Sequence, residues 1–145
     1  MSTESKKRSK IVGYTSGVFD MFHIGHLNLL RQAKEQCDYL IVAVSTDELV
    51  QQYKNKLPII PFKERCAIVA AIKYVDEVVP QINRNKIEAF DKYKFDVMFH
   101  GDDWKGEKQF EEVDKYMKSK GALGMKYLNH TDGISSTILR EKIGK

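Results

Sequence analysis

The chain has 145 residues, of which 42% are hydrophobic and 30% charged, a composition that suits a single globular domain and excludes wholesale disorder. No apolar run approaches the roughly 18 residues that a membrane span needs, so we expect no membrane insertion. Its two cysteines, Cys37 and Cys66, are far apart in the sequence, which excludes a disulfide framework or a CxxC site and favours a reducing, cytoplasmic location.

The net charge of +4 arises mostly in the first ten residues. They contain one acidic and four basic side chains, namely Glu4, Lys6, Lys7, Arg8 and Lys10. No apolar stretch lies beside these charges, so the segment does not have the composition of a secretory signal. We therefore expect residues 1–10 to form a disordered basic arm, and we expect no nucleic-acid partner for the nearly neutral remainder.

Short apolar runs alternate with longer amphipathic segments along the chain. In chain order the pattern predicts a strand at 11–16, a helix at 25–36, a strand at 39–44, a loop at 51–60, a helix beginning at Pro61, a strand at 74–79, a helix at 85–92, a strand at 95–100, a helix at 109–119, a strand at 125–128 and a helix at 135–143. Strict alternation is typical of parallel strands joined by right-handed crossovers. The predicted fold class is α/β, a single domain with a five-stranded parallel sheet and helices on both faces.

Polar residues gather where four of the predicted strands end. The clusters are Gly17–His26 (GVFDMFHIGH), Ser45–Glu48 (STDE), Gly101–Trp104 (GDDW) and Thr131–Thr137 (TDGISST). Ligands of open α/β sheets bind outside the carboxyl ends of the strands. This edge of the sheet is therefore predicted to carry the functional site, although Ser45–Glu48 is better explained as a helix cap.

His23 and His26 lie three residues apart at the predicted start of a helix, so their rings share one side of its first turn. Gly25 lets a ligand approach the backbone, and the free N–H groups of a helix N-terminus attract anions. This arrangement favours a phosphate site. The spacing leaves two alternatives open, a metal pair completed by Asp20 and two histidines that are merely hydrogen-bonded at the surface.

A second helix start follows Gly133, where Ser135, Ser136 and Thr137 supply hydroxyl and N–H groups. Taken singly, this cluster is what a helix N-cap requires. Because two helix starts meet at the same edge of one sheet, a cradle for a polyphosphate is favoured over two unrelated caps.

Together these segments resemble the cytidylyltransferase family, within the nucleotidyltransferases marked by HxGH. The resemblance rests on GVFDMFHIGH, STDEL, the loop with Lys54 and Lys56, Glu64–Arg65, YVDEVV, GDDW and TDGISST, which occur in family order over about residues 11–143. The chain is most similar to the small bacterial glycerol-3-phosphate type. The resemblance implies a Rossmann-like catalytic domain over residues 11–145.

The family joins CTP to a phosphorylated alcohol by direct in-line attack, giving a CDP-alcohol and pyrophosphate. For this chain the resemblance implies catalytic roles for His23, His26, Lys54 and Asp20, and a nucleotide site formed by Gly17, Val18, Phe19, Gly25, Asp102, Trp104, Thr131, Gly133, Ile134, Ser135, Ser136 and Thr137. It assigns substrate contacts to Lys56, Arg65 and His130. It also implies Mg²⁺ carried with the triphosphate, with Asp20 as a candidate ligand, and a homodimer.

Two positions depart from the family pattern. His130 stands where the family usually has Arg, and an imidazole makes one phosphate contact where a guanidinium makes two. Lys73 stands where relatives commonly carry Arg, in a segment that helps form the family's dimer. Because of His130, choline, ethanolamine or polyol phosphates and phosphonates are alternatives to glycerol 3-phosphate as acceptor. An ATP-dependent adenylyltransferase and a nucleotide-binding module without catalysis are the rival functions.

Overall fold

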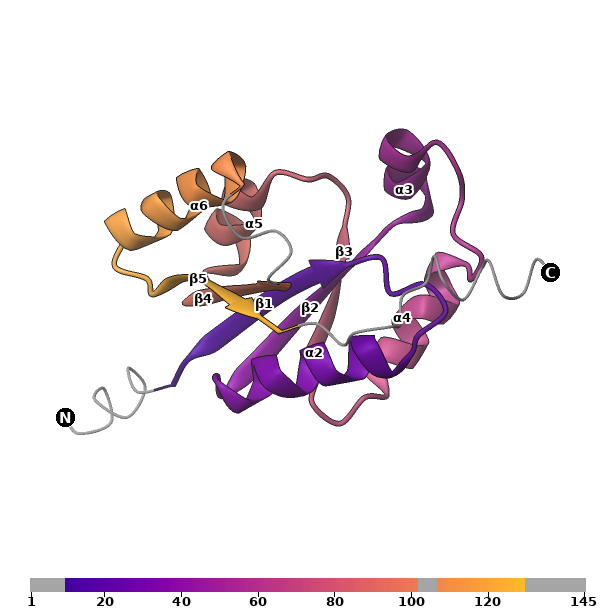
Figure 1. The fold of residues 1–145 in the computed structure, drawn as a ribbon, viewed down its shortest axis with the longest axis horizontal. Helices are drawn as coiled ribbons and strands as arrows, with labels where there is room; N and C mark the ends of the chain where they lie inside the picture. Colours follow the sequence, from indigo (N-terminus) through magenta and orange to yellow (C-terminus); the bar gives the residue numbers. More distant parts are fainter. Residues whose placement is uncertain (1–9, 102–106, 130–145) are drawn as a thin grey trace.

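The computed structural model describes residues 10–101 and 107–129, which form five parallel strands flanked by helices (Figure 1). The strands lie in the spatial order β3-β2-β1-β4-β5 and comprise β1 (Val12–Gly17), β2 (Tyr39–Ser45), β3 (Glu77–Gln81), β4 (Val97–Gly101) and β5 (Gly124–Leu128). The predicted five-stranded parallel sheet is confirmed. The chain runs from β1 outward to β2 and β3 and then crosses to β4 on the other side of β1. The strand order therefore reverses at β1, and ligands of such sheets bind at the carboxyl end of the strands at this point.

Helices cover both faces of the sheet, as predicted. Helices α2 (Ile24–Glu35) and α4 (Phe62–Ala70) lie on one face, and α5 (Lys86–Tyr93) and α6 (Lys108–Ser119) lie on the other (Figure 1). A further helix, α3 (Asp47–Lys54), follows β2 and lies beyond its carboxyl end. Within the described part of the chain, no helix is both long enough and apolar enough to cross a bilayer.

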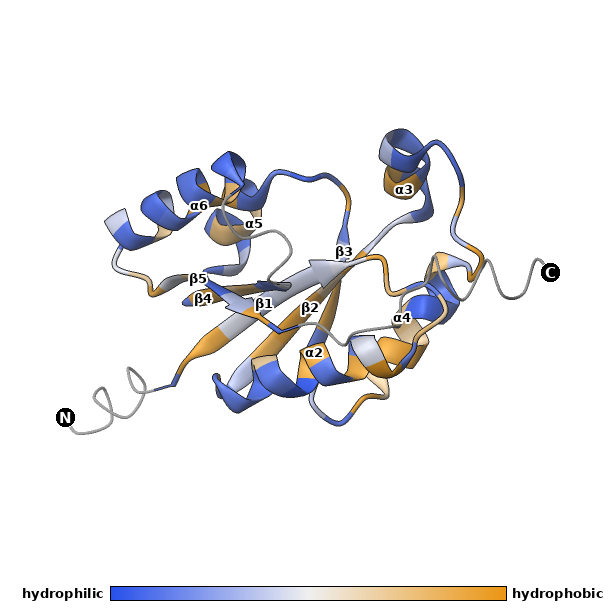
Figure 2. Cartoon of the chain, in the orientation of Figure 1, coloured by the Kyte–Doolittle hydropathy of each residue, from blue (hydrophilic) through white to orange (hydrophobic). Residues whose placement is uncertain are grey.

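Strand β2 is buried along nearly its whole length and separates the two halves of the core. Leu40, Val42 and Val44 pack in the half covered by α2 and α4. Ile41 and Ala43 point to the opposite face and pack in the half covered by α5 and α6. A run of apolar residues is what a strand covered on both faces requires, and Figure 2 shows β2, which lies between β3 and β1, as a hydrophobic strand.

Three carboxylates fasten the amino edge of the sheet. Asp38 accepts a hydrogen bond from the backbone N–H of Ile11 at 2.7 Å, and Asp96 accepts one from Val12 at 2.9 Å. Asp76 does the same for the N–H of Leu40 at 2.8 Å. These bonds satisfy backbone donors at the starts of the strands, where the ladder supplies no partner. They fix the edge opposite the predicted site.

For helix α3 the sequence predicted a cap at Ser45–Glu48 but no helical span. Residues 51–54 were expected to be loop, but they form the second half of this helix. Thr46 caps α3 by accepting a hydrogen bond from the N–H of Leu49, and Leu49 and Val50 anchor its first turn in the interior. Two buried residues are too few to give a helical period in the sequence, whereas the cap had been anticipated in the segment Ser45–Glu48.

Strand β3 begins three residues later than predicted. Tyr74 and Val75 precede it in a turn, and the N–H of Val75 donates to the carbonyl of Ile72 at 3.0 Å. The apolar run predicts that a strand is present but not where it begins and ends, because the residues of the preceding turn also pack against the core. The predicted helix at 135–143 and residues 1–9 of the predicted arm lie outside the described residues.

Candidate active site

Two adjoining pockets lie at the carboxyl edge of the sheet. The first, called here the histidine pocket, has a volume of about 320 Å³ and is lined by His26, Asp20, Lys54 and Lys56, among others. The second, the arginine pocket, has about 510 Å³ and is lined by Arg84, Lys86 and Lys54, among others. Both are bordered by Ser16–Val18 at the end of β1, by Leu29 and by Lys54. They therefore form two halves of one site.

The two histidines are held by hydrogen bonds from the backbone at the start of α2. His23 caps the helix, because its Nδ1 accepts from the N–H of Gly25 at 3.0 Å. His26 Nδ1 accepts from the N–H of His23 at 3.2 Å, and the two rings stack with centroids 3.9 Å apart. A neutral imidazole that accepts at Nδ1 carries its proton on Nε2. Both rings therefore have Nε2–H groups to donate to a ligand.

Burial keeps the histidines neutral. It lowers the pKa of His23, and it lowers the pKa of His26 to about 4, with the neighbouring His23 acting in the same direction and the charge of Asp20 opposing it. At neutral pH the pair thus donates hydrogen bonds without carrying charge. A phosphate placed at Nε2 would favour the protonated forms, so the positive charge would rise when the anion binds.

Acid is expected to destabilise this fold between about pH 6.5 and pH 4. Burial, helped by the charge of Lys86, also lowers the pKa of His100 to about 4. A histidine whose pKa is lowered by folding binds its proton more tightly in the unfolded chain, so its contribution to stability is complete above pH 6.5 and is lost as the pH falls toward 4. Each of His26 and His100 should account for about 3 kcal/mol of the free energy of unfolding over this range.

Urea denaturation at pH 7, 5.5 and 4.5 would measure this loss. A His100→Gln variant removes one of the two groups, so its stability should fall less steeply with acid than that of the unaltered protein. Parallel curves for the two proteins would contradict the assignment.

Asp20 anchors the loop between α3 and α4. It is buried, and its two carboxylate oxygens accept hydrogen bonds of 2.8 Å from the N–H groups of Ile59 and Ile60. The described residues contain no cluster of three side chains able to hold a metal ion. With its oxygens committed to amides, Asp20 fits the expected role of orienting the site better than that of a metal ligand.

The end of α3 and the loop over residues 55–61, called here the lysine loop, bring the two predicted lysines to the site. Lys54 ends α3 and borders both pockets, and Lys56 lines the histidine pocket. Asn55 between them has a left-handed backbone with φ 59°, which ends the helix and turns the chain. The structure thus brings Lys54, Lys56 and His26 together from distant parts of the sequence.

The residues that follow β1 also lie where they were predicted. Gly17 and Val18 border both pockets, and Phe19 lines the histidine pocket and packs edge-on against the His26 ring at 5.4 Å. Phe19 has a backbone φ of 55°, which is unusual for a bulky residue. Strained backbone of this kind persists where the surrounding contacts hold a loop in place, as is common at functional sites. The sequence carries no signal of this backbone conformation.

Arg65 was expected to contact the substrate, but its environment is different. The residue is 1% exposed, and its guanidinium donates to the carbonyls of Ile60, Val18 and Ser45 at 2.8 Å each. It also forms a 2.6 Å ion pair with Asp47. Arg65 therefore ties the ends of β1 and β2 to the lysine loop. We correct its role from substrate contact to a positioning residue.

Sequence reasoning missed three residues of the arginine pocket. Tyr53, Arg84 and Lys86 line it, and Lys86 Nζ donates to Ser16 Oγ at 2.7 Å. The signal that could have found the last two is topological, because the segment after β3 is another strand end at the same edge. Because β3 was predicted to end at residue 79 and not at Gln81, Arg84 and Lys86 were not recognised as residues that follow a strand end.

Several predicted site residues lie outside the described part of the chain and stay predictions. They are Asp102, Asp103, Trp104, His130, Thr131, Gly133, Ile134, Ser135, Ser136 and Thr137.

The parallel sheet and the imidazole donors and lysines at its carboxyl edge define an α/β protein suited to phosphorylated ligands. The family model for cytidylyltransferase-like proteins matches residues 14–142. The chain therefore belongs to the cytidylyltransferase-like family, as its sequence motifs predicted.

Individual relatives extend over most of the chain. It is 39% identical over 135 residues to the glycerol-3-phosphate cytidylyltransferase of Bacillus subtilis (strain 168), which covers 92% of this chain and 96% of the relative. It is 38% identical over 137 residues to the ethanolamine-phosphate cytidylyltransferase of Arabidopsis thaliana, covering 91% of this chain and 32% of the relative. It is 35% identical over 141 residues to the FAD synthase of Thermococcus kodakarensis, covering 95% of each chain.

Among solved structures, the fold is similar to that of a lipopolysaccharide core biosynthesis protein from Thermoplasma volcanium. The TM-score is 0.69 and the identity 25%, over 85% of this chain and 98% of the other. The names of these relatives thus differ in the molecule that they specify.

Proposed function

We propose that this protein transfers CMP from CTP onto a small phosphorylated alcohol, with glycerol 3-phosphate as the leading acceptor. The observation that carries the proposal is the pair of neutral histidines at the start of α2, which hold their protons on Nε2. His26 lines the same pocket as Lys54, and His23 stacks on the His26 ring. The 39% identity to a glycerol-3-phosphate cytidylyltransferase over almost the whole of both chains supports the choice of acceptor.

In the proposed reaction, a phosphate oxygen of the acceptor attacks the α-phosphorus of CTP. A phosphoanhydride bond forms there, the bond from the α-phosphorus to the bridging oxygen breaks, and pyrophosphate leaves with that oxygen. Catalysis then depends on alignment and on stabilising negative charge. His23 and His26 donate hydrogen bonds from Nε2 to the phosphate oxygens, and Lys54 and Lys56 neutralise them. Asp20 and Arg65 hold the segments next to these groups, because they bond to the backbone of Ile59, Ile60 and Val18.

Further features of the proposal come from the family resemblance. We propose that Mg²⁺ accompanies the triphosphate and neutralises part of its charge. We also propose a homodimer. Analytical ultracentrifugation tests the dimer independently of activity.

Pyrophosphate release tests the activity directly. Purified protein with Mg²⁺ is expected to release pyrophosphate with CTP and one alcohol phosphate from a panel that pairs CTP, ATP, GTP and UTP with glycerol, ethanolamine, choline and polyol phosphates. A His23→Ala variant in parallel should lose this turnover. Calorimetry that detected neither CTP nor ATP binding would contradict the nucleotide site altogether.

The FAD synthase relative favours a second candidate, transfer of an adenylyl group from ATP. The same panel separates the two, because turnover with ATP and none with CTP would select the second.

A further inference from the structure

The arginine pocket is strongly one-sided in charge. Three basic side chains line it, Lys54, Arg84 and Lys86, and none of the described residues that line it is Asp or Glu. Among the described residues, neither Arg84 nor Lys86 forms an ion pair with a carboxylate. Two neighbouring cations, Arg84 and Lys86, that have no ion pair within the described residues make a positive potential on their side of the pocket.

Lys86 is held inside this pocket and not spread over the surface. Its Nζ donates to Ser16 Oγ at 2.7 Å, at the end of the central strand. Burial, and to a lesser extent the charge of Arg84, lower the pKa of Lys86 to about 8, which still leaves the ammonium mostly protonated at neutral pH. A ligand anion would relieve the mutual repulsion of the two cations.

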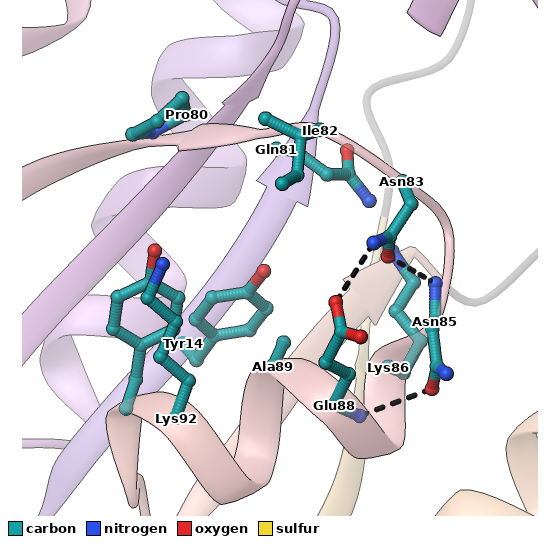
Figure 3. Close-up of a pocket in the computed structure, with 11 residues that line it drawn as sticks. Tyr14, Pro80, Gln81, Ile82, Asn83, Asn85, Lys86, Glu88, Ala89 and Lys92 are labelled. Carbon is teal, nitrogen blue, oxygen red and sulfur yellow. Dashed lines mark hydrogen bonds between the residues drawn. The ribbon is translucent and has the colours of Figure 1, made fainter.

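The loop that carries these cations is pre-organised. Figure 3 shows Asn83, Asn85 and Glu88 joined by three hydrogen bonds. Asn83 Nδ2 donates to Glu88 Oε1 at 2.7 Å, the N–H of Asn85 donates to Asn83 Oδ1 at 2.9 Å, and the N–H of Glu88 donates to Asn85 Oδ1 at 3.0 Å. Arg84 and Lys86 flank Asn85, so the turn presents both to the pocket without ordering on binding.

Each of the two described aromatic rings that line the pocket already packs against a neighbouring side chain. The guanidinium of Arg84 lies over the Tyr53 ring, 4.6 Å from its centroid. Phe110, the other ring among the described lining residues, packs against His100 at 4.8 Å. A substituted ammonium is bound through free aromatic faces or a nearby carboxylate. The described part of the pocket offers neither.

The two pockets offer different groups to a ligand. The histidine pocket is lined by His26, whose Nε2–H donor lies in the first turn of α2 and suits a triphosphate oxygen. The arginine pocket lies on the other side of Ser16–Val18 and shares Lys54 with it. An acceptor placed there would bring its phosphate toward Lys54 and its remaining groups toward Arg84 and Lys86.

Resting on the proposed function, we propose that Arg84 and Lys86 select the acceptor by charge. The acceptor then bears hydroxyl or carboxylate groups beside its phosphate, and alcohol phosphates that bear an ammonium group are rejected. An ammonium group brought next to Arg84 and Lys86 would be repelled, and such repulsion between like charges is a common means of rejecting the wrong partner. This separates the chain from its ethanolamine-phosphate cytidylyltransferase relatives within one family.

The test compares kcat/KM for glycerol 3-phosphate and ethanolamine phosphate, two acceptors of similar size that differ in charge. With CTP and Mg²⁺, the unaltered protein should favour glycerol 3-phosphate by at least about thirtyfold. Arg84→Glu should lower this preference at least about tenfold, through both a slower reaction with glycerol 3-phosphate and a faster one with ethanolamine phosphate. Lys86→Gln should shift it in the same direction.

Lys115→Glu is the matched control, because it makes the same change of net charge on the exposed side of α6, away from both pockets. It should leave the preference unchanged. Equal use of both acceptors by the unaltered protein, or a preference that Arg84→Glu does not move, would overturn the selection by charge while leaving cytidylyl transfer intact. Absence of turnover with every acceptor would instead overturn the proposed function.

Discussion

Replacing His26 with alanine is expected to lower kcat about a hundred- to a thousandfold. The substitution removes an Nε2–H donor from the place where charge develops on the reacting phosphate, and the loss of one such donor has effects of this size. Because the interaction strengthens in the transition state, kcat and kcat/KM should fall together. Steady-state pyrophosphate release with CTP and the best acceptor measures both.

A second variant separates chemistry from structure. His26→Asn can keep an acceptor for the N–H of His23 but cannot place a donor where Nε2 lies, since its side chain is shorter. It should retain the thermal stability of the protein and still lose kcat. Arg31→Ala, exposed on the same helix, should lose neither. Recovery of activity in His26→Asn would show that His26 merely caps the helix.

Replacing Arg65 with methionine is expected to reduce the free energy of unfolding by about 3–5 kcal/mol. Methionine fills much of the space but leaves Asp47 without its cation and the three carbonyls at Ile60, Val18 and Ser45 without their donor. Arg65→Lys should recover only part of the loss, because a single ammonium cannot reproduce the geometry of a planar guanidinium. Urea denaturation monitored by circular dichroism measures the change.

The surface ion pair of Arg31 and Glu35 supplies the control for this experiment. The two side chains are 42% and 62% exposed, so solvent screens the pair and Arg31→Ala should cost less than about 1 kcal/mol. If Arg65→Met were no more destabilising than Arg31→Ala, the positioning role of Arg65 would be wrong.

Sequence periodicity predicted the fold well because burial on both faces imposes a simple pattern. The apolar run of β2 is one such pattern. Five short strands that alternate with helices in a chain of this length are compatible with few folds other than a parallel sheet covered by helices. The second half of α3 escaped prediction for the opposite reason. It lies beyond the edge of the sheet, and residues 51–54 are exposed, so no apolar stripe marks it.

The candidate site was predictable where chemistry is concentrated in a short segment. His23, His26 and Asp20 lie within seven residues, and their strand-end position places them at the right edge. Arg65 could not be assigned in this way. Its partners are backbone carbonyls of segments up to 47 residues distant, and a carbonyl has no sequence signature. Arg84 likewise belongs to no sequence motif, and only the structure identifies it as a residue that lines the pocket.

The two hydrogen bonds that Asp20 accepts allow the neighbouring side chains to vary in evolution. Asp20 grips the lysine loop through the N–H groups of Ile59 and Ile60, which every residue except proline possesses. The side chains at these positions, and at the exposed Leu57 before them, are therefore free to change without releasing the loop. Natural variation can remodel the rim of the cavity one residue at a time while the reactive groups keep their alignment, which suits a scaffold whose relatives serve different metabolites.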